Sequence, residues 1–111
     1  MRNEVRRNMT HARIQELIKE RKVLITDHAW DAIDERGIEV HELVAVLVNG
    51  EIIEDYRNDK PCPSYLTLGF VGPRPIHVLV ALCKEHIRII TAYEPNPERW
   101  INSRLRNKGG K

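Results

Sequence analysis

Four side chains that could carry out acid–base or anion chemistry lie in the strand-like C-terminal half of this sequence. His77 stands among apolar neighbours in one strand-like run, Tyr93 ends the next run, and Arg74 and Arg88 are close to them in sequence. Imidazole is the strongest candidate for a general acid or base, because its unperturbed pKa of about 6.5 is close to neutral pH. These residue types favour a metal-free acid–base site on a sheet face. The alternative for His77 is a hydrogen-bonded structural histidine.

Three further candidates lie at predicted helix ends. His28 follows Asp27 at a helix start, where the positive end of the helix dipole favours a neutral imidazole that could act as a base; the alternative is a local capping contact. Arg36 precedes the Gly37 that ends the same helix, and its guanidinium could bind the free carbonyls there or reach a phosphate. Arg99 lies in a predicted C-terminal helix. For Arg74, Arg88 and Arg99, the alternative to phosphate binding is surface ion pairing.

The motifs of several large enzyme classes are missing from the sequence. There is no HxxxH or HxH pair, so the histidines give little support to a metal site. There is no G-x-x-x-x-G-K, GxSxG, HExxH or GxGxxG motif either. We therefore expect no metal and no cofactor, and we disfavour P-loop nucleotide hydrolysis and serine-hydrolase chemistry.

A chain of 111 residues with 41% hydrophobic and 31% charged residues has the size and composition of one globular domain. No apolar run approaches the roughly 20 residues that a membrane span needs, and the basic, polar N-terminus lacks the apolar core of a secretory signal. We therefore expect a cytoplasmic protein with no membrane partner. Cys62 and Cys83 are the only cysteines, and we expect both thiols to stay reduced in such a protein.

The net charge of +2 hides a separation of charge along the chain. Residues 1–13 carry four basic groups and one acidic group, and residues 99–111 carry five basic groups and no acid. Residues 27–59, in contrast, contain ten carboxylates and only two arginines. Such an acidic stretch repels phosphate, so any nucleic acid would have to bind to the later strands and the C-terminal tail. The alternative function of basic tails is solubility, with disorder.

Periodicity and turn residues predict an α+β fold. Helices are predicted over residues 10–22, 27–36 and 39–48; the last has the strongest helical periodicity, and Gly37 ends the second. Strand-like runs follow at about 51–57, 63–70, 74–82 and 86–93, and a short helix is predicted around Trp100. We therefore expect two to three N-terminal helices packed on a four-stranded antiparallel meander, with a short C-terminal helix. The expected organisation is a flexible basic N-terminus (1–9), a single α+β domain (10–103) and a flexible basic tail (104–111).

Several short motifs, in this order and spacing, resemble a known family. They are His28-Ala29, Glu35-Arg36-Gly37-Ile38, Gly50-Glu51-Ile52-Ile53-Glu54, Pro63-Ser64, Leu68-Gly69, Pro75-Ile76-His77-Val78, and Thr91-Ala92-Tyr93-Glu94-Pro95 with Trp100. Over residues 24–100 the chain resembles a widespread prokaryotic family of small uncharacterised proteins, which is similar to the RelE and BrnT type toxins. The resemblance implies a RelE-like fold, metal-independent cleavage of messenger RNA, and neutralisation by a small zinc-finger or DNA-binding antitoxin.

The resemblance also implies functional roles for His28, Arg36, His77 and Tyr93. One departure from the family pattern concerns the helix that follows His28. Family members often carry basic residues there, whereas this sequence has Trp30 and Ala32 within an acidic run.

Two hypotheses follow from the sequence. The first is a toxin-like endoribonuclease in which His77 acts as base or acid, with His28 or Tyr93 as its complement. The charge on the phosphate would be stabilised by arginines, namely Arg36, Arg74, Arg88 and Arg99. The second is a non-catalytic RelE-like protein-binding module, which the acidic stretch favours because it suits a basic protein partner. The sequence makes no prediction of the oligomeric state.

Overall fold

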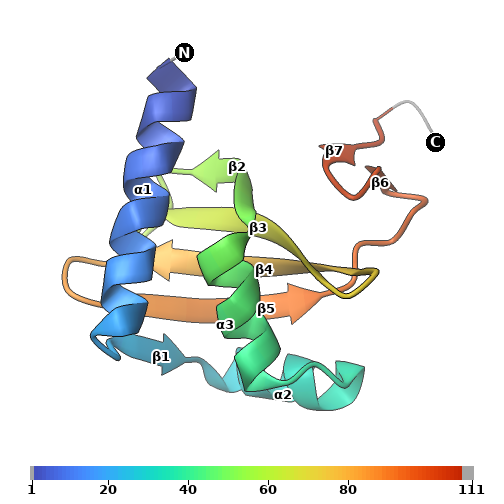
Figure 1. The fold of residues 1–111 in the computed structure, drawn as a ribbon, viewed down its shortest axis with the longest axis horizontal. Helices are drawn as coiled ribbons and strands as arrows, with labels where there is room; N and C mark the ends of the chain where they lie inside the picture. Colours follow the sequence, from blue (N-terminus) through green and yellow to red (C-terminus); the bar gives the residue numbers. More distant parts are fainter. Residues whose placement is uncertain (1, 109–111) are drawn as a thin grey trace.

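The structure, a computed structural model, describes residues 2–108 of the chain. The helices are α1 (Arg2–Lys19), α2 (Asp27–Arg36) and α3 (Val40–Asn49). The strands are β1 (Val23–Ile25), β2 (Glu51–Tyr56), β3 (Ser64–Val71), β4 (Arg74–Leu82), β5 (Ile87–Tyr93), β6 (Trp100–Ile101) and β7 (Leu105–Arg106). Figure 1 shows α1 and α3 crossing one face of the main sheet, with the short β6–β7 hairpin at one end.

The main sheet is mixed and has five strands in the order β1-β5-β4-β3-β2. The pairs β2–β3, β3–β4 and β4–β5 are antiparallel, whereas β1 pairs parallel with β5. The predicted α+β fold with three helices is confirmed, but the prediction of a four-stranded antiparallel sheet is wrong. The difference comes from Val23–Ile25, three apolar residues that add a fifth strand when the chain returns from α1 along the edge of β5.

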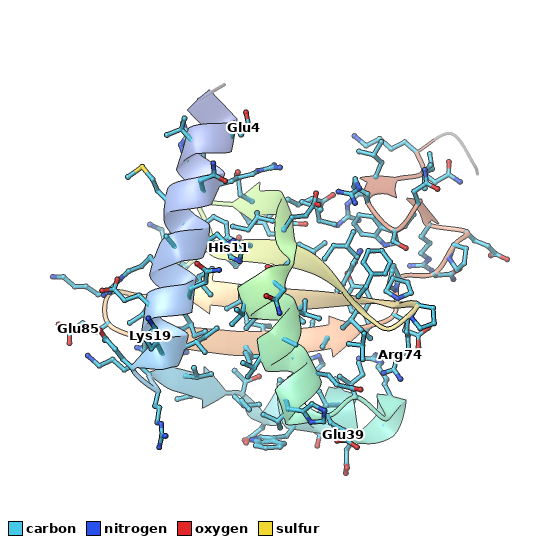
Figure 2. The ribbon with its side chains drawn as sticks, in the orientation of Figure 1. Glu4, His11, Lys19, Glu39, Arg74 and Glu85 are labelled. Atoms are coloured by element: carbon cyan, nitrogen blue, oxygen red, sulfur yellow. A yellow bond between two sulfur atoms is a disulfide. The ribbon has the colours of Figure 1, made fainter. Side chains whose placement is uncertain are left out.

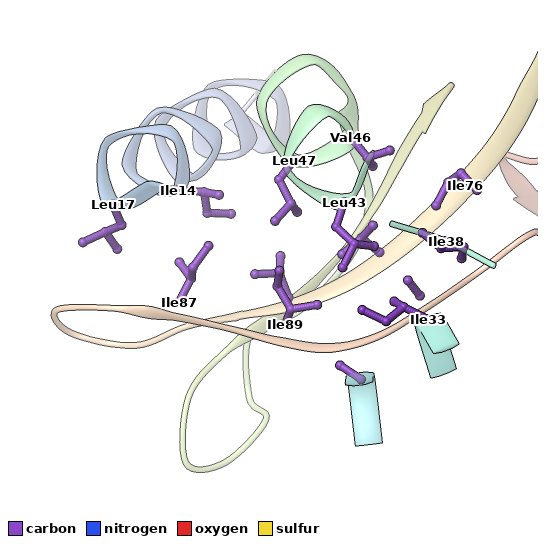
Figure 3. Packing of buried hydrophobic residues seen from close by; sticks show 14 residues of the cluster. Ile14, Leu17, Ile33, Ile38, Leu43, Val46, Leu47, Ile76, Ile87 and Ile89 are labelled. Carbon is purple, nitrogen blue, oxygen red and sulfur yellow. The ribbon is translucent and has the colours of Figure 1, made fainter. Parts of the chain in front are cut away.

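The hydrophobic core lies between the sheet and the three helices. Side chains alternate along β4, so that Ile76, Val78 and Val80 all point toward the helices. Residues of all three helices, of β5 and of the loop after α2 complete the cluster, whose packing Figure 3 shows: Ile14, Leu17, Ala29, Ile33, Ile38, Leu43, Val46, Leu47, Ile87, Ile89 and Ala92. Full burial of each such side chain stabilises the fold by about 1.5–3 kcal/mol.

Polar contacts also join α1 to the end of α3. His11 lies between the two helices (Figure 2), and its Nε2 is 2.8 Å from the carbonyl oxygen of Leu47. Gln15 Nε2 donates to the carbonyl of Val48 at 2.8 Å. The last carbonyls of a helix have no partner within it, so these side chains supply the missing donors.

The ends of α2 follow the sequence prediction. The Thr26 hydroxyl accepts a hydrogen bond from the Ala29 amide at 3.1 Å and caps the helix start. Gly37 has φ of 66°, and its amide bonds to the Ile33 carbonyl, which ends the helix.

Helix α1 begins at Arg2 and not at Thr10, so the predicted helix start is wrong. The first half of this helix is polar and has no apolar stripe, so the sequence pattern does not reveal it. Arg7 fixes this half to the sheet, because its Nη1 donates to the Ile52 carbonyl at 3.2 Å. Residues 2–9 therefore form part of α1, and Met1 lies outside the described residues.

The prediction of a C-terminal helix around Trp100 is also wrong. Trp100–Ile101 instead pairs antiparallel with Leu105–Arg106, so residues 105–106 of the predicted tail form a strand. The turn between them contains Asn102 and Ser103, both with positive φ. Asn tolerates this left-handed conformation better than most residues, which favours a tight hairpin. Residues 109–111 of the predicted tail lie outside the described residues.

The two cysteines form a disulfide, so the prediction of reduced thiols is wrong. Cys62 lies in the β2–β3 loop and Cys83 follows β4; the Leu82 amide bonds to the Pro63 carbonyl at 2.8 Å, which brings the two together. Disulfides persist mainly in oxidising compartments, so the cysteines no longer support a cytoplasmic location. Among residues 2–108, no helix combines the length and apolar character required to cross a membrane.

Candidate functional site

His77 and Tyr93 lie on the sheet face opposite to the one that α1 and α3 cover. His77 pairs with Leu68 on β3 and with Tyr93 on β5, so these three side chains project to the same side. Their neighbours Ile76 and Val78 project to the opposite side, into the core. The β6–β7 hairpin covers the His77 side of the sheet through Trp100, whose ring centroid is 4.5 Å from that of His77.

His77 is fully buried and both of its ring nitrogens have partners. Nε2 is 2.6 Å from the carbonyl oxygen of Ser103, which can only accept, so Nε2 carries a hydrogen and donates. Nδ1 is 3.3 Å from the hydroxyl of Tyr93. Burial lowers the pKa of His77, and the hydrogen bond to Ser103 only partly opposes this effect. His77 is therefore a neutral imidazole that holds the turn of the hairpin against the sheet.

Tyr93 is half-buried beside His77. Burial raises the pKa of its hydroxyl, so the phenol stays protonated at neutral pH and can donate to Nδ1 of His77. Of the predicted catalytic residues, the structure thus brings Tyr93 and His77 together.

His28 is placed elsewhere. It lies exposed in the first turn of α2. Within residues 2–108, the hydrogen-bond partners of His77 are Tyr93 and Ser103 and do not include His28. The structure gives the two histidines no shared site.

Arg36 and Arg74 each bind groups of the protein. Nη1 of Arg36 donates to the Ala92 carbonyl at 2.9 Å, so this guanidinium covers the edge of β5 instead of the end of its own helix. Arg74 lies where β3 turns into β4 (Figure 2), with Nε 3.0 Å from a Glu94 oxygen and Nη2 3.8 Å from a Glu42 oxygen. Both arginines therefore hold elements together in this structure.

Arg88 and Arg99 lie in two different concavities. Arg88 lines a small cavity of about 110 Å³ beside the disulfide, and its Nε is 3.4 Å from His86 Nε2. Arg99 is exposed and lines a concavity of about 340 Å³ that Tyr93 also lines. The four predicted phosphate-binding arginines thus do not converge on one point.

A cluster that the sequence analysis missed lies next to His77. Arg106 binds Glu54 through two parallel hydrogen bonds, with Nε 2.9 Å from Oε2 and Nη2 3.0 Å from Oε1. The same Nη2 is 3.2 Å from the hydroxyl of Tyr56, which itself donates to Glu54. The Arg106 guanidinium also lies 4.7 Å above the ring of Trp100, a cation–π contact. A carboxylate, a phenol and a guanidinium are thereby held in mutual contact.

This cluster forms part of the wall of a concavity of about 670 Å³, which we call the basic groove. Its lining comprises five cations, two acids and four other residues: Arg7, Arg57, Arg104, Arg106, Lys108, Glu54, Asp55, Ile53, Tyr56, Ile101 and Leu105. Asp55 lies 3.7 Å from Arg7 and 3.5 Å from Arg57, and Arg104 pairs with Glu51 just outside the lining. Cations outnumber carboxylates in the lining, so the groove favours a negatively charged ligand.

The middle part of the chain shows which family it belongs to. Residues 25–94, more than half of the chain, match DUF4258, a domain of unknown function. The chain belongs to this family. Comparisons with curated proteins and with solved structures found no match.

The DUF4258 match covers only part of the site. Glu54, Tyr56, His77 and Tyr93 lie within it, whereas α1 and the β6–β7 hairpin lie outside it. The hairpin contributes Arg106 to the cluster, and residues from outside the match supply most of the cations of the basic groove. The DUF4258 sheet therefore carries the acid–base groups, and the flanking segments carry most of the positive charge.

The protonation states of Glu54, Tyr56 and Arg106 follow from their contacts. Burial raises the pKa of Glu54, but hydrogen bonds from Arg106 and Tyr56 outweigh it and keep that pKa below its usual value. Burial and the hydrogen bond to Glu54 raise the pKa of Tyr56. The hydrogen bond to Glu54 raises the pKa of Arg106 as well. At neutral pH the cluster thus contains an ionised carboxylate, a protonated phenol and a permanent cation.

The sequence contains signals for part of this site. Glu54 and Tyr56 are two residues apart in a predicted strand, so the alternation of side chains places them on one face. Arg106 gave no such signal, because it lies 52 residues away from Glu54 in a segment that was predicted to be a tail.

Among the described residues, no group of three or more His, Cys, Asp or Glu side chains is arranged to hold a metal ion.

Proposed function

We propose that this protein is a metal-independent endoribonuclease that binds RNA in the basic groove and cleaves it with Glu54 and Tyr56. The observation that carries the proposal is the contact of a carboxylate, a phenol and a guanidinium in the wall of a cationic concavity. Phosphate contacts by Arg and Lys dominate the affinity of proteins for nucleic acids. The groove therefore suits the substrate, and the cluster suits the reaction.

RNA cleavage without a metal needs a base, an acid and a positive charge. The base removes the proton of a ribose 2′-hydroxyl, and the 2′-oxygen attacks the adjacent phosphorus. The bond to the 5′-oxygen breaks, and the acid protonates this leaving oxygen, giving a 2′,3′-cyclic phosphate and a 5′-hydroxyl. We assign the base to Glu54 and the acid to Tyr56; each positioned group of this kind contributes typically about 10²–10⁴-fold to the rate.

Arg106 would link substrate binding to the activation of Glu54. A guanidinium binds the oxygens of a phosphate in the same two-pronged way as it binds a carboxylate. When the phosphate takes over Arg106, Glu54 loses the Arg106 hydrogen bonds, which help to keep its pKa low, and keeps the hydrogen bond from Tyr56. The basicity of Glu54 then rises where the 2′-hydroxyl is bound, while Arg106 neutralises the charge that develops on the phosphate.

His77 becomes a positioning residue in this proposal. Its ring is buried and binds Ser103, between the two strands of the hairpin that carries Arg106. Tyr93 supports the same ring through Nδ1. The pair would fix Arg106 over the cluster without touching the substrate.

The proposed reaction agrees with the resemblance to RelE and BrnT type toxins. What supports a toxin role is that resemblance together with the basic groove, since a toxin of this kind has to bind messenger RNA. A small zinc-finger or DNA-binding antitoxin would then be the neutralising partner. Induced expression in a bacterial host tests the role: growth arrest with decay of messenger RNA supports it, and unchanged growth with intact RNA contradicts it.

A direct test uses the purified full chain and single-stranded RNA in a buffer with a metal chelator. We expect cleavage products that end in a 2′,3′-cyclic phosphate. Tyr56→Phe removes the proposed acid and should lower the cleavage rate by about 10²-fold or more. Tyr65→Phe, on the same sheet but packed against the core, is the matched control and should cleave like the wild type. Intact RNA with the wild-type protein would refute the enzyme.

The alternative is a non-catalytic protein-binding module. One observation favours it: Glu54, Tyr56 and Arg106 satisfy one another, and His77 is closed off from solvent. Acidic residues in the 27–59 stretch would then bind a basic protein partner. Failure to cleave RNA in both the purified and the cellular experiment would favour this module.

A further inference from the structure

Arg106 lines two concavities. One is the basic groove, and the other is the concavity of about 340 Å³ that contains Arg99. The lining of this second concavity, which we call the Arg99 pocket, is Tyr93, Glu94, Asn96, Arg99, Trp100 and Arg106. Arg106 is the one residue that lines both concavities, so it is the residue that a ligand occupying both would contact in each of them.

The Arg99 pocket offers hydrogen-bond donors to an anion. Among residues 2–108, no carboxylate lies within ion-pair distance of the exposed Arg99 guanidinium. Glu94, the one acid in the lining, is already paired with Arg74 at 3.0 Å. Asn96 accepts the Glu98 amide through Oδ1 at 2.9 Å, which leaves the NH₂ group of its side chain to donate.

We infer that the Arg99 pocket is a second phosphate subsite for the same RNA strand. This inference rests on the proposed function, since it extends the strand that is bound in the basic groove. Arg106 would contact the phosphate at the cluster, and Arg99 and Asn96 would contact a phosphate further along the chain. The substrate class is therefore a single strand of several nucleotides, because a dinucleotide has only one phosphodiester and occupies the groove alone.

The same geometry makes recognition largely independent of base sequence. Base-stacking platforms require exposed aromatic faces. Trp100 is 6% exposed, and Arg106 covers its ring. The hydrogen-bond donors of the Arg99 pocket are guanidinium and amide groups, which suit the sugar–phosphate backbone.

The test measures the binding of 2′-O-methyl RNA, which cannot be cleaved, to the full chain by fluorescence anisotropy at several salt concentrations. The two probes are a dinucleotide and an oligonucleotide of about ten residues. Arg99→Ala should weaken binding of the long probe several-fold and reduce the slope of log affinity against log salt by about 0.7, the value for one phosphate contact on a single strand. Binding of the dinucleotide should not change.

Two further variants sharpen the comparison. Asn96→Asp keeps the acceptor for the Glu98 amide but places a negative charge in the Arg99 pocket. It should therefore weaken binding of the long probe at least as much as Arg99→Ala does. Lys84→Ala removes one exposed charge in the β4–β5 turn, away from both concavities, and should bind both probes like the wild type. Circular dichroism and thermal unfolding check that each variant is folded.

The possible failures can be told apart. If Arg99→Ala binds the long probe with wild-type affinity and wild-type salt dependence, the subsite is refuted while the proposed function stands. If Arg99→Ala weakens binding of the dinucleotide as much as binding of the long probe, Arg99 belongs to the basic groove and the separate subsite is refuted. If the wild-type protein binds neither probe, the proposed function itself fails.

Discussion

On the helix-covered face of the sheet, Leu47 and Ile89 are buried among apolar side chains, whereas on the hairpin-covered face His77 is equally buried but hydrogen-bonded to Ser103 and Tyr93. The first face is closed by helices through non-directional hydrophobic contacts. The second face is closed by a two-stranded hairpin through directional contacts, including the paired hydrogen bonds of Arg106. The first face thus supplies stability, and the second holds polar groups in fixed positions. We expect substitutions on the two faces to change different properties.

The largest expected effect on stability comes from the helix-covered face. Leu47→Ala removes a fully buried side chain of the core and should lower the free energy of unfolding by about 2–5 kcal/mol. Leu105→Ala on the hairpin removes a side chain that is 63% exposed and should change it by no more than about 0.5 kcal/mol. Urea denaturation measures both variants. Equal losses of unfolding free energy in the two variants would contradict the distinction between the faces.

The disulfide is expected to have the next largest effect. Cys62 and Cys83 close a loop with a sequence separation of 21 residues, so the bond should stabilise the fold by about 3 kcal/mol, mainly by restricting the unfolded chain. The double variant Cys62→Ala/Cys83→Ala should lose this stability in urea denaturation. The wild type should match the double variant once a reductant is added. Identical curves for the oxidised wild type and the double variant would show that the bond contributes nothing.

The smallest effect concerns the pH dependence of stability and arises on the hairpin-covered face. Burial lowers the pKa of His77 below its ordinary value of 6.5 in the folded state, so the unfolded chain binds a proton more readily. The stability that neutral His77 contributes is complete above about pH 6.5 and falls with pH below it, by up to about 1.4 kcal/mol per pH unit for this one group. Glu54 opposes this shift and Arg106 reinforces it.

His77→Gln separates this group from the other titrating groups. Unfolding free energies of both proteins are compared between pH 7.5 and pH 5, and the wild type should lose more stability than the variant. Parallel pH profiles would mean that His77 titrates as it does in the unfolded chain, and would contradict its closed environment.

The sequence predicts the helix-covered face better than the other. Apolar residues at helical spacing in α3 and alternating residues in β4 depend only on local periodicity, and both enter the core. Thr26 and Gly37 mark the ends of α2 through local capping chemistry. The short strand β1 and the polar first half of α1 lack such a pattern, so their structure depends on contacts with distant parts of the chain.

On the hairpin-covered face, the decisive contacts join distant residues. His77 and Tyr93 could be assigned to one face because strand alternation connects them, and the structure places them together. Arg106 could not be assigned, because its partners Glu54 and Tyr56 are about half the chain away and no local pattern connects them. The disulfide between Cys62 and Cys83 was missed for a different reason, because two cysteines in a chain expected to be cytoplasmic favour free thiols.

The most direct test of the account compares two neighbouring carboxylates of the basic groove. Single-turnover cleavage of single-stranded RNA is measured for Glu54→Gln and Asp55→Asn, which remove the same charge from adjacent residues. We predict that Glu54→Gln lowers the rate by about 10²–10⁴-fold, whereas Asp55→Asn stays within a few-fold of the wild type. Equal rates for the two variants, or a Glu54→Gln protein as active as the wild type, would contradict the assignment of Glu54 as the base.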